Sequence, residues 1–184
     1  MLNLKWYPMR VTYHRELKIK DQLDILGIES FVPMCYKLVE TKKGRKKILT
    51  SAIHNLIFVH STQEAITHLK MTRKECEPLR YMMKPVAGNR ALREIITVPD
   101  REMYNFMRVA SALDDSVIFL DYNDFIGKEG SRVRITGGSF AGVEGVIKRI
   151  KKNKHVVVQI EGIAAVAVTF VPASLLQPIE QLDN

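Results

Sequence analysis

The sequence feature that most limits the fold is the stretch 130–160, in which short runs of alternating polar and apolar residues are separated by glycines. Its first run is RVRIT, where Val133 and Ile135 alternate with arginines, as in a strand with one buried face. Three more candidate strands follow, with the sequences GVIKRI, KHVVVQI and VAVTFV. Strands this short and this close together predict a small β-barrel.

Glycines mark the bends of this barrel. We expect Gly137 and Gly138 to form a turn with positive φ, and Gly142 and Gly145 to lie where the chain bends or another backbone passes closely. Phe140 lies on the same glycine-rich loop, where an aromatic side chain has little core to enter. Two interpretations stay open for it: contact with a partner, or a lid over the end of the barrel.

The first 113 residues alternate between strand and helix patterns. The run KWYPMRV has β-formers on both sides of Pro8, and a proline inside a strand favours an edge position, because it has no N–H to donate. Further strands are expected in ESFVPM, ILTSAIHNLIFVHS and RYMMKPV, with a basic turn KKGRKK between the first two.

Apolar residues at helical spacing predict three helices in the same region. The first helix is expected from Arg15 to a stop at Gly27, with apolar residues Ile19, Leu23 and Leu26. The second has Thr62 as a cap and apolar residues Ala65, Ile66 and Leu69. The third has Pro99 near its start and apolar residues Met103, Phe106, Met107 and Ala110. The order of elements indicates an α+β domain with helices flanking a mostly antiparallel sheet.

Charge divides the chain into three parts. The segment 114–127, DDSVIFLDYNDFIG, holds four aspartates and no basic residue, and it separates the α+β pattern from the β pattern. We therefore expect an α+β domain at 1–113, an acidic linker at 114–127 and a small all-β barrel at 128–184.

The overall composition limits the class of function. The chain has 184 residues and a net charge of +8, which favours an anionic partner, nucleic acid before membrane; a basic protein with no such partner fits the same balance. No apolar run approaches the roughly 18 residues that a membrane span needs, and the N-terminus does not resemble a signal peptide. With only Cys35 and Cys76, no disulfide framework is indicated, so we expect a cytoplasmic protein.

No catalytic or metal-binding motif stands out. The histidines of the first domain have no clustered carboxylates or cysteines at metal or triad spacing, and Ser51 and Ser61 are not in a nucleophile elbow. These histidines are His14, His54, His60 and His68. We therefore predict no enzyme, no cofactor and no metal.

Two motifs carry a resemblance to a known family. The run GSRVRITGGSFAGVEGVIKRI resembles a KOW motif, which occurs in NusG-type elongation factors and in some ribosomal proteins. The run WYPMRVTYHRELKIKDQLDILGIESFVPM resembles the start of the NusG N-terminal domain, with its Trp-Tyr opening at Trp6 and Tyr7 and its Val-Pro-Met at 32–34. Both motifs stand in the family's order, so the chain resembles a NusG-family transcription factor.

The resemblance implies a transcription elongation factor; nothing in the sequence demands more than a monomer, and we expect no membrane partner. In the family, the N-terminal domain docks on the clamp of the largest RNA polymerase subunits and suppresses pausing. The KOW domain (SH3-like) recruits a second partner, either the termination factor Rho or a small-subunit ribosomal protein. Some members also contact non-template DNA or nascent RNA.

The resemblance also assigns residues by position. Those implied for polymerase binding are Tyr7, Arg10, Ile53, Asn55, Leu56 and Phe58. Those implied for nucleic-acid binding are Thr12, His14, Arg15, Lys18, Gln22 and Arg73. Those implied for the KOW partner are Phe140, Val143, Ile163 and Val166. The competing interpretation is that Leu56 and Phe58 are ordinary sheet residues and that the charged helix face is solvated.

Two departures from the general factor indicate a specialised paralog. Residues Ile53 to Leu56 replace a Phe-Pro-Gly-Tyr-like run, and the connection 73–99 is longer than a minimal member needs. Both resemble the UpxY type of antitermination factor, which is associated with capsular polysaccharide operons. The alternatives are the general housekeeping NusG, and a KOW-type ribosome-associated RNA-binding protein.

Overall fold

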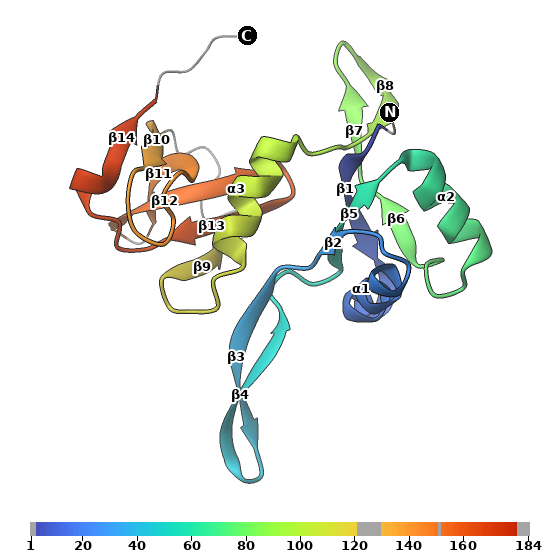
Figure 1. Cartoon of the computed structure of the whole chain (residues 1–184), viewed down its shortest axis with the longest axis horizontal. Helices are drawn as coiled ribbons and strands as arrows, with labels where there is room; N and C mark the ends of the chain where they lie inside the picture. The colour runs from blue at the N-terminus through green and yellow to red at the C-terminus, as the bar shows by residue number, and fades with distance from the viewer. Residues whose placement is uncertain (1–2, 121–129, 151, 180–184) are drawn as a thin grey trace. The chain divides into compact units, whose positions relative to one another are not determined.

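The structure is a computed structural model that describes residues 3–120, 130–150 and 152–179. The chain forms two compact units, Met1–Asp100 and Arg101–Asn184. Figure 1 shows the first unit in blue to green and the second in yellow to red. Among the described residues, no helix is long and apolar enough to cross a membrane.

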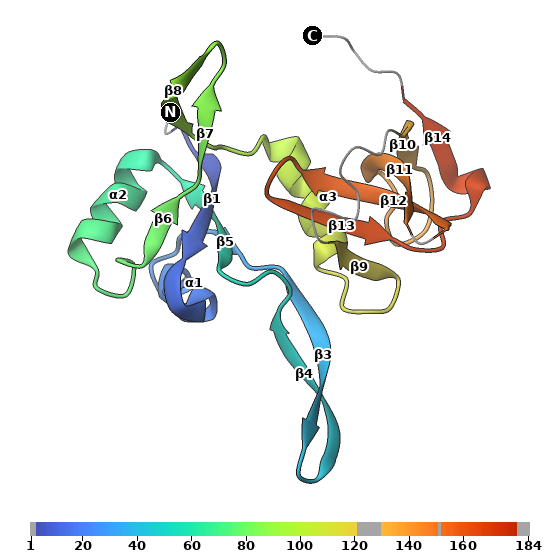
Figure 2. The ribbon, with the colours of Figure 1, turned by 180° about the vertical axis from the view of Figure 1, so that it is seen from behind.

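The first unit is built on a four-stranded antiparallel sheet. Its strands, in spatial order, are β2 (Ser30–Phe31), β5 (Leu56–Ser61), β1 (Lys5–Val11) and β6 (Leu79–Tyr81). Helices α1 (Glu16–Ile25) and α2 (Gln63–Thr72) pack against it, as Figures 1 and 2 show. The core joins alternate residues of β1 and β5 to apolar helix residues, among them Met9, Ile57, Val59, Ile19, Leu23 and Ile66. This arrangement is the predicted α+β domain.

The predicted edge position of the first strand is wrong, because β1 lies between β5 and β6. Pro8 is nevertheless accommodated. It pairs with Phe58 on the β5 side, whereas β6 pairs only with Met9, Arg10 and Val11. The missing N–H of Pro8 therefore lies beyond the end of the β6 ladder.

The helix boundaries follow the sequence signals closely. Helix α1 is followed by Gly27 with a φ of +68°, the left-handed conformation that glycine adopts without strain. Helix α2 is capped by Thr62, whose Oγ1 accepts a 3.2 Å hydrogen bond from the N–H of Ala65. A short 3-10 turn, η1 (Thr12–His14), precedes α1.

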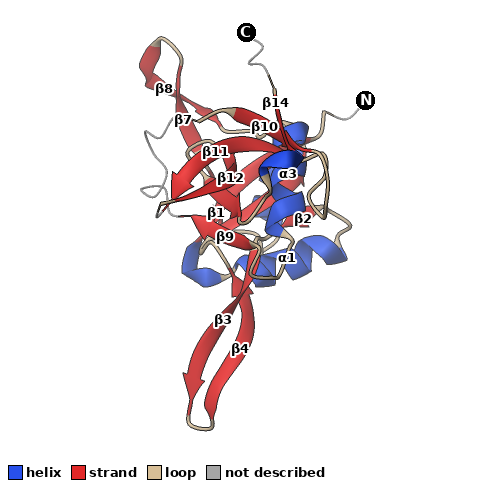
Figure 3. Ribbon diagram, turned by 90° about the vertical axis from the view of Figure 1, so that its left-hand side faces the viewer, coloured by secondary structure: helices blue, strands red, loops and turns tan. Residues whose placement is uncertain are grey.

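Two hairpins extend the first unit. Strands β3 (Met34–Thr41) and β4 (Gly44–Ser51) form a hairpin that points away from the sheet in Figure 3 and carries the predicted basic turn at its tip. Strands β7 (Met83–Val86) and β8 (Asn89–Ile95) form the second. The sequence predicts one strand in RYMMKPV, but the structure divides this run between β6 and β7.

The second unit contains a six-stranded antiparallel sheet beside helix α3 (Asp100–Ala110). Its strands, in spatial order, are β14 (Leu176–Pro178), β10 (Arg132–Ile135), β11 (Glu144–Ile150), β12 (Asn153–Ile160), β13 (Ala164–Val168) and β9 (Val117–Leu120), with a 3-10 turn η2 (Ala173–Leu175) before β14. Strands β10 to β13 are the four predicted ones. The predicted order, an α+β domain followed by a small all-β domain, is confirmed.

Two glycines serve the purposes expected of them. A Cβ on Gly145 would lie 2.7 Å from the carbonyl oxygen of Val157, so β11 and β12 approach too closely for any side chain there. Gly138 has a φ of +76° in the β10–β11 turn. The positive φ predicted for Gly137 is wrong, because only its neighbour adopts the left-handed conformation.

The predicted domain boundaries stay a prediction. The two compact units meet at residues 100 and 101, whereas the sequence places the end of the first domain at 113, so α3 lies between the two positions. Strand β9 falls inside the predicted linker 114–127 and pairs with β13. Residues 121–129 lie outside the described part of the chain.

Candidate functional site

The residues implied for polymerase binding lie on two neighbouring strands and one turn of the first unit. Arg10 on β1 is directly opposite Leu56 on β5, and Tyr7 is opposite Val59. Side chains alternate along each strand, so Arg10, Leu56 and Phe58 share one face of the sheet. Ile53 and Asn55 lie in the turn between β4 and β5.

These residues differ in their exposure. Arg10 is exposed, and Ile53 and Asn55 are half-buried. Leu56 and Phe58 are both buried, at 2% and 0% exposure. The accessible members of the set are therefore the charged residue of β1 and the residues of the β4–β5 turn.

Tyr7 is placed apart from the rest of the set. Its side chain is in the core beneath α1 and α2, and its ring meets the edge of the Tyr81 ring at a centroid distance of 5.9 Å. Burial, followed by the nearby charge of Glu64, raises the pKa of Tyr7. Tyr7 therefore packs in the core. A contact with polymerase would need its side chain on the other face of the sheet, with Arg10.

The β4–β5 turn is tied to the segment before α1. The N–H of Val11 donates to the carbonyl oxygen of Asn55 at 3.0 Å, and the N–H of His14 donates to Asn55 Oδ1 at 3.1 Å. Tyr13, His14 and Asn55 all have positive φ, at 62°, 51° and 61°. Such strain in non-glycine residues persists only where surrounding contacts hold it, and it often marks functional sites.

The residues implied for nucleic-acid binding are on the surface of the first unit. Thr12, His14, Arg15, Lys18 and Arg73 are exposed, and Gln22 is half-buried. A cleft of about 350 Å³ brings part of the set together; it is lined by Arg15, Lys18, Ile19, Asp21, Gln22 and Glu75. Two carboxylates in the same cleft reduce its positive potential, so the cleft is less basic than the sequence of α1 alone indicates.

The residues implied for the KOW partner divide into two pairs. Val143 and Val166 are fully buried and belong to the core of the second unit, whereas Phe140 and Ile163 are half-buried. The sequence misses a more exposed aromatic residue, Phe170, which is 89% exposed and has a φ of 59°. It lies two residues beyond the end of β13, and the run VAVTFV gives no sign that the strand ends at Val168.

The second unit also holds a buried carboxylate. Glu144 on β11 accepts hydrogen bonds from Arg101 on α3 and, at 2.7 Å, from Arg134 on β10. Burial alone would raise the pKa of Glu144, but the hydrogen bonds from Arg134 and Arg101 outweigh it, so the pKa is lowered. A carboxylate held ionised by two guanidinium groups stabilises the packing of α3 on the sheet rather than exchanging protons.

Two of the four histidines discussed in the sequence analysis lie close together in the structure. His14 and His54 are 40 residues apart, yet their rings pack edge to face at a centroid distance of 5.2 Å, and the carboxylate of Glu16 lies beside them. The sequence shows no carboxylate at metal or triad spacing from these histidines, and the metal-free interpretation of them stays a prediction. Spacing along the chain did not show the cluster, because the pairing of β1 with β5 creates it.

Comparison with known proteins gives two matches along the chain. The sequence model of the family described as "Transcription termination factor nusG" matches residues 4–107, and that of the KOW motif matches residues 129–161. No curated protein matches the chain significantly. Among solved structures, one described as "Domain interaction in Thermotoga maritima NusG" is 19% identical, with a TM-score of 0.45 over 97% of this chain and 98% of that one.

The family match covers more than half of the chain's 184 residues, and the KOW match follows it in the order that the sequence motifs predict. The protein belongs to the NusG family of transcription factors.

Proposed function

We propose that this protein is a specialised transcription elongation and antitermination factor. It binds RNA polymerase and suppresses pausing or termination on particular operons, such as capsular polysaccharide operons. The observation that carries the proposal is the presence of a NusG domain and a KOW motif in one chain. It acts by binding rather than by catalysis, as a monomer in the cytoplasm.

The polymerase-binding surface is centred on Arg10, Ile53 and Asn55. Arg10 is exposed, and the β4–β5 turn that carries the other two is held to β1 by the hydrogen bonds of Asn55. Leu56 and Phe58 are buried, so a change at either would test folding before binding. The departure of Ile53 to Leu56 from the usual family run lies at this surface and supports a specialised fit.

Capture by purified core RNA polymerase tests the surface. We expect Arg10→Glu and Ile53→Glu to reduce capture by at least about tenfold, because a reversed charge or a new carboxylate opposes docking. Arg93→Glu is the matched control, since Arg93 is exposed on the β7–β8 hairpin, outside the proposed surface. Equal capture of the native protein and its three variants would exclude this surface as the polymerase-binding site.

The specialised role needs a measurement in cells. Chromatin immunoprecipitation of the tagged protein should show occupancy confined to a few operons, with loss of transcription in their distal genes on deletion. Occupancy over most transcribed genes would instead support the general housekeeping NusG. Association with ribosomes and not with polymerase would support the ribosome-associated alternative.

Contact with non-template DNA or nascent RNA is proposed for the exposed face of α1. Arg15, Lys18 and Gln22 line one cleft there. Lys18→Ala should weaken binding to a single-stranded oligonucleotide. It should also reduce the slope of log affinity against log salt concentration by about one, because one phosphate contact is lost. Lys5→Ala is the control, because Lys5 is exposed at the opposite end of β1. Identical salt slopes for both variants would contradict the proposal.

The KOW partner, Rho or a small-subunit ribosomal protein, is proposed to contact the loop of Phe140 together with Ile163. Both residues are half-buried, whereas Val143 and Val166 are fully buried in the second unit. Phe140→Ala should weaken binding to whichever purified partner is captured. Phe170→Ala removes another aromatic ring of the same unit; a loss of binding in that variant alone would move the contact surface to Phe170.

A further inference from the structure

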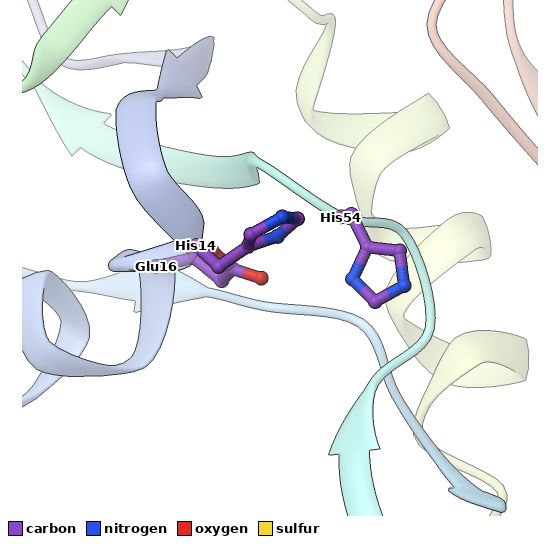
Figure 4. Close-up of side chains that lie close together, drawn as sticks. All are labelled: His14, Glu16 and His54. Carbon is purple, nitrogen blue, oxygen red and sulfur yellow. The ribbon is translucent and has the colours of Figure 1, made fainter.

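A cluster of three potential metal ligands lies where the segment before α1 meets the β4–β5 turn. His14, Glu16 and His54 each place one ligand atom within 4.8 Å of the others. Figure 4 shows the two imidazole rings and the carboxylate gathered at one place in the first unit. All three residues belong to the same compact unit, so local structure alone fixes their arrangement.

The backbone around the cluster is held in a strained conformation. His14 has a φ of 51°, and Asn55, next to His54, has a φ of 61°. The hydrogen bond from the N–H of His14 to Asn55 Oδ1 joins the two segments at 3.1 Å. Positive φ is unfavourable for residues other than glycine, so surrounding contacts such as this hydrogen bond must hold the two segments beside each other.

The carboxylate of Glu16 gives the second, independent observation. Glu16 is only 2% exposed, and its Oε1 accepts a 2.6 Å hydrogen bond from Ser51 Oγ. Its other oxygen, Oε2, is buried and has no hydrogen-bond partner in the structure. A buried carboxylate oxygen needs a cation or a donor, because leaving it unpaired is costly.

We infer that His14, Glu16 and His54 form a binding site for a late first-row divalent cation, represented by Zn²⁺. Two imidazoles and one carboxylate are a common three-residue ligand set for such ions, with the remaining coordination positions open to water or to another group. His54 stands between Ile53 and Asn55, so the site adjoins the proposed polymerase surface, but metal binding by these three side chains does not depend on that proposed function.

The ligand atoms must come closer together to hold one ion. Ligand atoms on one tetrahedral zinc are about 3.3 Å apart when each bond is about 2.0–2.1 Å. The present separations, up to 4.8 Å, are larger, so the side chains of the two exposed histidines would have to turn toward the buried carboxylate when a metal binds. A bound metal would link His14 of η1 to His54 of the β4–β5 turn and restrict both segments to one conformation.

Isothermal titration of the metal-free full chain with ZnCl₂ tests the inference. We expect one ion to bind per chain. We also expect His14→Ala and His54→Ala each to lose at least about 100-fold in Zn²⁺ affinity, because removing even a residue that only hydrogen-bonds to a metal ligand lowers affinity about 10–100-fold. Glu16→Gln keeps an oxygen for Ser51 but removes the charge, so it should weaken binding as well. His68→Ala, an exposed histidine on α2, is the matched control and should bind as the native protein does.

A second measurement keeps the test independent of stability. Backbone amide spectra establish that each variant is folded, and the absorption of the Co²⁺ complex reports the ligands. Nitrogen and oxygen ligation supports the site, whereas a thiolate charge-transfer band would assign the metal to Cys35 or Cys76 and overturn it. The inference also fails if the native chain binds no Zn²⁺, or if His14→Ala and His54→Ala bind it as tightly as the control does.

Discussion

Ser51 Oγ donates a 2.6 Å hydrogen bond to Oε1 of the buried Glu16, which joins the end of β4 to the first residue of α1. The two residues are 35 positions apart, so the bond ties the base of the long β3–β4 hairpin to α1 within the first unit. Glu16 also lies at the helix N-terminus, where a negative charge is favoured.

The first prediction concerns Ser51→Ala. In metal-free protein, this change leaves both oxygens of Glu16 without a protein partner, so we expect the free energy of unfolding to fall by about 1–3 kcal/mol. Ser30→Ala is the control, because the buried hydroxyl of Ser30 has no hydrogen-bond partner in the structure and its loss should be nearly neutral. Urea unfolding measures both, and equal losses would contradict the importance of the bond.

The same carboxylate shows why sequence spacing did not reveal the cluster of His14, Glu16 and His54. His14 and Glu16 are neighbours in the chain, but His54 joins them only through the pairing of β1 with β5, which sets Arg10 opposite Leu56. Positive φ at Tyr13, His14 and Asn55 then turns the side chains together. Neither strand register nor strain in non-glycine residues can be read from residue types.

Local periodicity, by contrast, predicted the helices and the four central strands of the second unit. The edge position of the first strand was an error. Pro8 indicated an edge strand, but the short β6 leaves room for it in an interior one. The aspartates around Val117–Leu120 indicated a linker, and within that predicted linker these apolar residues form β9. Tertiary pairing, which residue types alone do not show, forms both strands.

The second prediction concerns the cap of α2. Thr62→Ala removes the 3.2 Å hydrogen bond from the N–H of Ala65, so we expect a loss of about 1 kcal/mol in the free energy of unfolding. Thr62→Ser keeps the hydroxyl and should stay close to the native value. Chemical denaturation monitored by Trp6, the single tryptophan, reports on this unit. Equal losses in the two variants would mean that the methyl group, and not the cap, matters.

The third prediction is a dependence of stability on pH. The pKa of Glu144 is lowered in the folded chain, so its stabilising contribution is complete above the ordinary glutamate pKa of about 4.3 and is lost as the pH falls below it. Burial raises the pKa of Glu102, whose contribution has the opposite sign.

A comparison of native protein with Glu144→Gln isolates the effect of Glu144. We expect the native protein to be the more stable at pH 7 and the difference to shrink between about pH 5 and pH 3. Amide exchange in β10 and β11 measures it within the second unit. A difference that does not change with pH would show that Glu144 acts through packing and not through its charge.

The last prediction concerns the close approach of β11 and β12. A Cβ on Gly145 would meet the carbonyl oxygen of Val157 at 2.7 Å, and a backbone atom cannot move aside without opening the ladder between the strands. We expect Gly145→Ala to lower the free energy of unfolding of the second unit by about 1–3 kcal/mol, as overpacking does. The matched control is Gly137→Ala, whose Cβ would meet only the flexible end of Leu175 at 3.1 Å. Amide exchange in β11 and β12 should therefore accelerate in Gly145→Ala and stay near the native rate in Gly137→Ala. Faster exchange in Gly137→Ala than in Gly145→Ala would contradict the prediction, because it would mean that the two strands accommodate a Cβ more easily than the turn does.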